Sequence, residues 1–199
     1  MSQHIFLSRS ELLLARDAWC ADAMLAAATY GPIAQWDISQ VTDLSFLFDG
    51  NSNSACKTFN DDISQWNTSA VTTLASTFRG ASAFNQPIGV WDVSRVESFS
   101  DTFQSAKAFN QSLADWDISG VSALGYMMFY STLALSDCNK ALIRASWAAQ
   151  WPHKWCAACG CPLVPVPLSL SCALLTRLPP CVTPPAGIPI TAPDAAGHA

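Results

Sequence analysis

Apolar and polar positions recur in one fixed order through the middle of the chain. Four tryptophans stand 30, 25 and 25 residues apart, at Trp36, Trp66, Trp91 and Trp116. The text after each of them repeats: WDISQVTDLSFLF, WNTSAVTTLASTF, WDVSRVESFSDTF and WDISGVSALGYMM. A second phrase precedes the last three, as FNDDISQW, FNQPIGVW and FNQSLADW. Self-similarity at such a period predicts a stack of repeats.

Aligning the copies places like residues in columns. The apolar columns are Val41, Val71, Val96 and Val121; Leu44, Leu74, Phe99 and Leu124; Phe48, Phe78, Phe103 and Met128; and Phe59, Phe84 and Phe109. A unit of this size cannot bury its own apolar face, whereas stacked copies bury one another's. The longer first spacing reflects an insertion near residues 51–57, which we expect in a loop.

The repeat predicts a solenoid of about four coils, each with a short parallel strand at residues 41–44 and its equivalents, followed by a short helical turn. The polar columns have a structural interpretation. In Asp-x-Ser the aspartate accepts a hydrogen bond from the backbone two residues on, as an Asx-turn. Asn67, which replaces aspartate in the second copy, can do the same.

Both ends of the repeat region carry helix signals. Ser8-x-x-Glu11 resembles a capping box, and Gly31-Pro32 ends the segment that it opens. At the other end Ser136 or Asp137 would begin a helix that runs from about residue 138 to residue 150, before Pro152. We therefore expect an N-terminal helical cap at residues 1–35, the repeats at 36–135, a capping helix at 136–155 and a disordered Pro/Cys-rich tail at 156–199.

The phrases W-D-V-S-x-V and F-N-Q-P-I-x-x-W carry a resemblance. Together they resemble the 26-residue repeat of bacterial surface proteins, the BspA-like leucine-rich-repeat group, filed as a domain of unknown function in mycoplasma lipoproteins and abundant in some algae. The resemblance spans residues 31–130. It implies an α/β leucine-rich-repeat-like solenoid, a role in surface display, adhesion or protein interaction, and an extracellular or cell-surface location. It brings no catalytic residues.

Composition and charge narrow the function. Of 199 residues 50% are hydrophobic, which is enough for a core. The net charge of −5 argues against a nucleic-acid partner, because phosphates require a basic patch. The opening residues lack the apolar run of a signal peptide. Pro162, Pro165 and Pro167 interrupt an uncharged stretch of the tail, so we expect no membrane span.

The sequence predicts no catalytic, cofactor-binding or metal site, and hence no enzyme. Cys156, Cys159 and Cys161 have Cys-x-x-Cys spacing but lack a fourth zinc ligand in a recognisable pattern. The aspartates at the Asp-x-Ser position are too few per copy for a calcium site. Cys20, Cys56 and Cys138 would form disulfides in an exported protein, for example Cys138 with Cys156, and would stay free thiols in the cytosol.

The favoured hypothesis is a non-enzymatic module for protein interaction or surface adhesion, with a protein or cell-surface ligand as its partner. Specificity would lie in the variable outward positions of the first three copies. These are Gln40, Asp43 and Ser45; Ala70, Thr73 and Ala75; and Arg95, Ser98 and Ser100. The alternatives are a Cys-rich metal-binding or redox protein, and a fragment or gene-model product of a longer surface protein.

Overall fold

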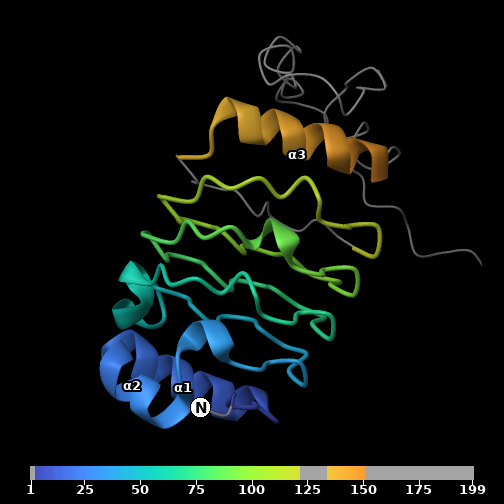
Figure 1. Ribbon diagram of the computed structural model, residues 1–199. Helices are drawn as coiled ribbons and strands as arrows, with labels where there is room; N and C mark the ends of the chain where they lie inside the picture. The colour runs from blue at the N-terminus through green and yellow to red at the C-terminus, as the bar shows by residue number, and fades with distance from the viewer. Residues whose placement is uncertain (1–2, 122–133, 151–199) are drawn as a thin grey trace, which may run out of the picture.

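The computed structural model describes residues 3–121 and 134–150 of the chain. They form the α-helices α1 (Arg9–Ala21), α2 (Ala23–Tyr30) and α3 (Asp137–Gln150), and the 3-10 helices η1 (Ile33–Gln35), η2 (Ser54–Thr58) and η3 (Ile88–Val90). Figure 1 shows α1 and α2 at one end of the molecule, α3 at the other, and the repeats as stacked loops between them.

The predicted fold class, an α/β leucine-rich-repeat-like solenoid with short parallel strands, is wrong. The described residues contain no strand. Between the copies, the structure has isolated parallel bridges of single residues, which join Asp43 to Thr73 and Thr73 to Ser98. The segment predicted to be a strand contributes one bridged residue per copy, so no sheet forms among the described residues.

A left-handed residue explains why the strands do not form. Phe46, Ser76 and Asp101 occupy the same place in successive copies and have φ values of 58°, 57° and 55°. A strand needs consecutive residues in the extended region, and a left-handed residue turns the chain out of it. Because none of the three residues is glycine, the sequence carries no conventional signal for this turn.

Backbone hydrogen bonds nevertheless join the copies through the turn. Leu44 donates its N–H to the Thr73 carbonyl at 3.2 Å, and Phe48 donates to Thr77 at 2.7 Å. The same bonds recur one copy later, from Leu74 to Ser98 at 3.0 Å and from Phe78 to Thr102 at 2.9 Å. The buried backbone is thus satisfied from copy to copy, which fixes the register of the stack.

The core consists of aromatic columns that run along the stack. Ring centroids of Phe48, Phe78 and Phe103 follow one another at 5.9 and 5.6 Å, and those of Phe59, Phe84 and Phe109 at 5.9 and 6.1 Å. Indole N–H groups tie each copy to the previous one, from Trp66 to the Ile33 carbonyl, Trp91 to Ile63 and Trp116 to Ile88. The columns predicted from the aligned copies are therefore confirmed in these positions.

The predicted Asx-turns are confirmed as well. The backbone N–H of Ser39 donates to Asp37 at 2.9 Å, and Ser69, Ser94 and Ser119 bond in the same way to Asn67, Asp92 and Asp117. Asn67 thus fills the place of the aspartates. These side chains serve the local backbone of each copy.

Helix caps at both ends follow the predicted residues. The Ser8 hydroxyl accepts from the Glu11 N–H, but Glu11 bonds to the Leu7 N–H and to His4 and not back to Ser8. Asp22, which the sequence reasoning did not single out, ends α1 and caps α2. The Ser136 hydroxyl accepts from the Asn139 N–H at the start of α3.

A disulfide between Cys20 and Cys56 ties α1 to η2, with the two Cα atoms 5.0 Å apart. The predicted domain limits stay predictions. The tail from residue 156, the proposed Cys156 partner of Cys138, and the fourth-copy positions Leu124 and Met128 lie outside the described residues.

Candidate functional site

The nine predicted interaction residues fall into three columns on the stack. Asp43, Thr73 and Ser98 are the bridged residues themselves, and Ser45, Ala75 and Ser100 follow two positions later. Leu44, Leu74 and Phe99 lie between the two columns and are buried, so the flanking side chains point away from the core. All six flanking residues are partly exposed. The structure therefore brings these two columns together.

The third predicted column is less well defined. Gln40 and Arg95 are exposed and Ala70 is partly buried, and these residues lie in the turns before the bridged positions. No hydrogen bond among the described residues joins one member of this column to another. The two bridged columns are thus the coherent part of the predicted face.

Polar side chains of the first column also hold their own backbone. Asp43 accepts from the Ser45 N–H at 2.7 Å, Thr73 from the Ala75 N–H at 3.2 Å, and Ser98 from the Ser100 N–H at 3.5 Å. The column has a structural role in every copy. The second column, with Ala75 and Ser100, is the freer of the two to vary.

Helix α1 covers the first copy of this face. Arg9 forms an ion pair with Asp43, with its Nε 3.2 Å from Oδ2. Its Nη2 donates to the Ser45 carbonyl at 2.6 Å. The first-copy residues are thereby occupied, and the open part of the face is Thr73, Ala75, Ser98 and Ser100. Sequence reasoning missed this cover because the contact spans 36 residues.

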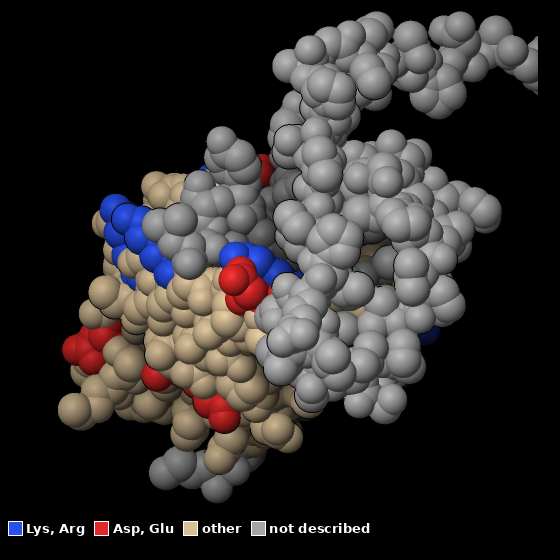
Figure 2. All heavy atoms as spheres, turned by 90° about the horizontal axis from the view of Figure 1, so that it is seen from above, with Lys and Arg blue, Asp and Glu red and all other residues tan. Residues whose placement is uncertain are grey.

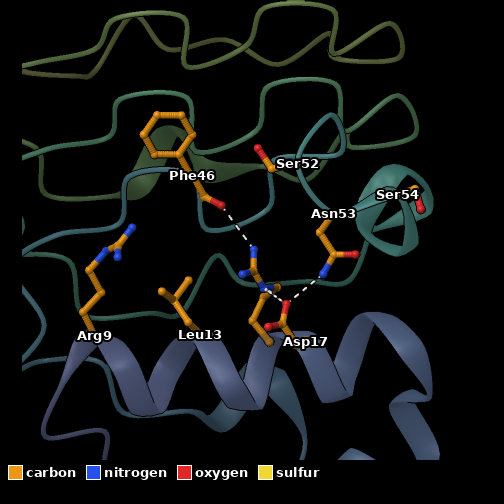
Figure 3. A pocket seen from close by; sticks show the side chains of 8 residues that line it. Arg9, Leu13, Asp17, Phe46, Ser52, Asn53 and Ser54 are labelled. Carbon is orange, nitrogen blue, oxygen red and sulfur yellow. Dashed lines mark hydrogen bonds and ion pairs between the residues drawn. The ribbon is translucent and has the colours of Figure 1, made fainter.

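An open pocket of about 490 Å³ lies where α1 meets the first copy. Figure 3 shows Arg9, Leu13 and Asp17 rising from α1 on one side, Phe46 on the opposite side, and Asn53 and Ser54 at one end. The lining residues are Arg9, Leu13, Arg16, Asp17, Phe46, Ser52, Asn53 and Ser54. The inserted loop of the first copy thus forms a wall of the pocket. That insertion was the one sequence signal that pointed here.

Arg16 is the buried charge of this pocket, with 8% of its surface exposed. Its Nη1 donates to the carbonyls of Phe46, at 3.2 Å, and of Leu47. Its Nε lies 2.9 Å from Asp17 Oδ1. Burial lowers the pKa of Arg16, Asp17 opposes that change, and the positive charge of Arg9 adds to the lowering.

Phe46 forms the opposite wall in the left-handed conformation, with 43% of its surface exposed. The Arg79 guanidinium carbon lies 5.3 Å from the centre of its ring. Arg79 in turn holds the fully buried Asp49, Nη2 to Oδ2 at 2.6 Å. Burial alone would raise the pKa of Asp49, but hydrogen bonds from Arg79, Ser52 and the Asn51 N–H together lower it. The Phe46 ring therefore packs against Arg79, whose position is fixed by its ion pair with Asp49.

Residues 21–141 match the model of a family described as Mycoplasma protein of unknown function, DUF285. The chain belongs to the DUF285 family. The general family relationship expected from the repeats is thus confirmed, whereas its leucine-rich-repeat part is not supported. No curated protein and no solved structure matches the chain.

The residues matched by the DUF285 model include the open columns but only part of the pocket lining. The open columns of the face lie inside the matched residues, and so does Phe46. Arg9, Leu13, Arg16 and Asp17 precede it. The pocket therefore joins a family repeat to an N-terminal helix that begins before the matched range.

The described residues can be compared with the requirements of a metal site and of a membrane span. They contain no group of three or more His, Cys, Asp or Glu side chains placed to hold a metal ion. Within the same ranges no helix combines the length and apolar character needed to cross a bilayer. Cys156, Cys159 and Cys161, on which the metal or redox alternative depends, lie outside the described residues.

Proposed function

We propose that this DUF285 protein is a non-enzymatic module that binds a protein partner across the open columns Thr73, Ala75, Ser98 and Ser100. One observation carries the proposal. These positions are partly exposed and alternate with buried Leu74 and Phe99, so small uncharged side chains of neighbouring copies form one continuous open surface. Stacked repeats bind partners across extended surfaces of this kind.

The low charge of the open columns indicates that a partner would bind them through shape complementarity and hydrogen bonds. Strong electrostatic steering of the partner is not expected. Thr73, Ala75, Ser98 and Ser100 are all uncharged. At the α3 end, Figure 2 shows the visible acidic and basic side chains as a few small groups among uncharged ones, with one acidic and one basic group side by side. Asp43, the carboxylate of the bridged column, is neutralised by Arg9. A face of this extent is at the small end of specific interfaces, so the expected Kd is in the micromolar range.

A cell-surface or extracellular location is part of the proposal. The surface-protein repeat that the sequence resembles supports it, and so does the pairing of Cys20 with Cys56. Disulfides persist in oxidising compartments and are rare in the reducing cytosol. Free thiols at both positions in protein isolated from its own cells would contradict this part of the proposal.

Site-specific photo-crosslinking tests the face. Benzoylphenylalanine is placed at Ser100 in one sample and at Val90, which is 73% exposed in η3, in a matched control. Each labelled full-length chain is irradiated with surface and secreted proteins of its own source cells. The proposal predicts a discrete adduct from position 100 and none from position 90. Equal adducts from both positions, or none from either, contradict it.

A further inference from the structure

Two guanidinium groups of α1 converge on the pocket below Phe46. Arg9 and Arg16 are seven residues apart, two helical turns, and so lie on the same side of the helix. Between them they donate to three consecutive carbonyls, those of Ser45, Phe46 and Leu47. They hold the same short segment from two sides, and both line the same open space.

Each of the two guanidinium groups has one terminal nitrogen without a hydrogen-bond acceptor among the described residues. Arg9 Nη2 donates to the Ser45 carbonyl, and Arg16 Nη1 donates to the two carbonyls that follow. Each Nε lies at ion-pair distance from a carboxylate, that of Asp43 or Asp17, but is buried and makes no hydrogen bond. Among the described contacts, Arg9 Nη1 and Arg16 Nη2 have no acceptor. Neither atom is fully buried, although only 8% of the surface of Arg16 is exposed. Arginine N–H groups in such a fork suit a carboxylate or phosphate oxygen.

Each guanidinium of the lining already has one carboxylate neighbour. Arg16 pairs with Asp17 inside the lining, and Arg9 pairs with Asp43 beside it, so an anion would bind through the remaining arginine N–H groups. Asp17 Oδ1 is engaged by Arg16 and also accepts from Asn53 Nδ2 at 2.7 Å. Arg9 and Arg16 repel each other, which an anion between them would relieve.

The wall opposite α1 favours a ligand that also carries an apolar group. Phe46 exposes its ring towards the pocket, in the left-handed conformation that it shares with Ser76 and Asp101 of the following copies. Leu13 stands on α1 between the two arginines. A ligand that reaches both arginines therefore also meets apolar surface.

We propose that this pocket binds a carboxylate attached to an apolar group, as at the C-terminus of a peptide chain or in a free aryl-alkyl acid. The proposal goes beyond the interaction face, since the residues of the pocket are not those of the open columns. The inserted loop at residues 52–54 and α1 would close around the carboxylate, with Phe46 against the apolar group.

Binding is measured by ¹H–¹⁵N NMR of the full-length chain. The reporters are the amide resonances of residues 46 and 52–54. The probes are N-acetyl-Gly-Gly-Phe as the free acid, the same peptide as its C-terminal amide, 3-phenylpropionate and inorganic phosphate. We expect saturable shifts with the two carboxylates and a Kd at least about ten-fold weaker for the amide. The tighter of the two carboxylates identifies the peptide or the free acid as the source.

Variants distinguish ligand binding in the pocket from partner binding on the open columns. Arg9→Gln is expected to weaken the free-acid peptide about ten-fold, and Arg9→Lys less, because the charge stays while the fork is lost. Arg95→Gln removes the same group outside the pocket and should change nothing. A chain with Ala75→Arg and Ser100→Arg, which alters the open columns and not the pocket, should also bind the peptide normally, even if the proposed function fails. Equal binding of acid and amide, stronger binding of phosphate than of either acid, or no saturable shift overturns the proposal.

Discussion

The indole Nε1 of Trp147 in α3 donates to the carbonyl of Leu113 at 3.1 Å. This repeats the bond from Trp116 to Ile88, at 3.0 Å, one copy earlier. Asn139 does the same for the asparagine column: its Nδ2 donates to Asn110 as Gln111 donates to Asn85. Helix α3 therefore presents the hydrogen-bonding groups of a further copy, and closes the stack with a different secondary structure.

Trp147→Phe tests this closure. The substitution keeps an aromatic ring in a buried position but removes the indole bond to the Leu113 carbonyl, which retains the Trp116 backbone N–H as a donor, and leaves a cavity where the larger ring was. The lost bond and the cavity together should cost about 1–3 kcal/mol. Urea unfolding at neutral pH measures the loss. Trp19→Phe is the control, because its indole bonds to Asp61 at an exposed site, where the loss should be below about 1 kcal/mol. Equal losses would show that Trp147 does not bond as described.

The Cys20–Cys56 disulfide should stabilise the N-terminal end. It closes a loop with a sequence separation of 36 residues, for which chain entropy predicts about 2–4 kcal/mol. The double variant Cys20→Ser/Cys56→Ser should unfold at correspondingly lower urea concentration under oxidising conditions. With excess reductant, wild type and variant should become alike. A difference that survives full reduction would contradict the assigned bond.

The Asx-turn aspartates make the protein sensitive to acid. Bonds from the Ser94 hydroxyl and then its N–H lower the pKa of Asp92, and those from Ser119 act likewise on Asp117. Since the folded pKa lies below the unfolded one, this stability is present above about pH 4 and is lost as the pH falls through the folded pKa.

Asp92→Asn/Asp117→Asn should reduce that loss. Asparagine keeps the turn, as Asn67 does in the second copy, but does not titrate. Urea midpoints at pH 7 and pH 3 should differ less in the variant than in wild type. Asp115→Asn, at an exposed site with no Asx bond among the described contacts, should leave the difference unchanged. An equal effect of both substitutions would exclude the turns as its source.

Sequence reasoning was accurate where the repeat itself carries the information. The Phe48 column and the Asx-turns follow from aligning the copies, and Ser136 follows from helix-capping chemistry. The strands were wrong because Phe46, Ser76 and Asp101 turn left-handed without a glycine to signal it. The pocket and the Cys20–Cys56 pairing depend on how α1 packs on the first copy. That packing joins residues outside the repeat, for which the copies offer no comparison.

Isothermal titration calorimetry with the partner crosslinked at Ser100 tests the central claim most directly. The variant Ala75→Arg/Ser100→Arg changes the open columns. The control variant Gln65→Arg/Val90→Arg adds the same charges at exposed positions, one residue before Trp66 and Trp91. We expect a Kd at least about ten-fold weaker for the first variant, which corresponds to about 1.4 kcal/mol, and a nearly unchanged Kd for the second. Equal affinities of the two variants would contradict it.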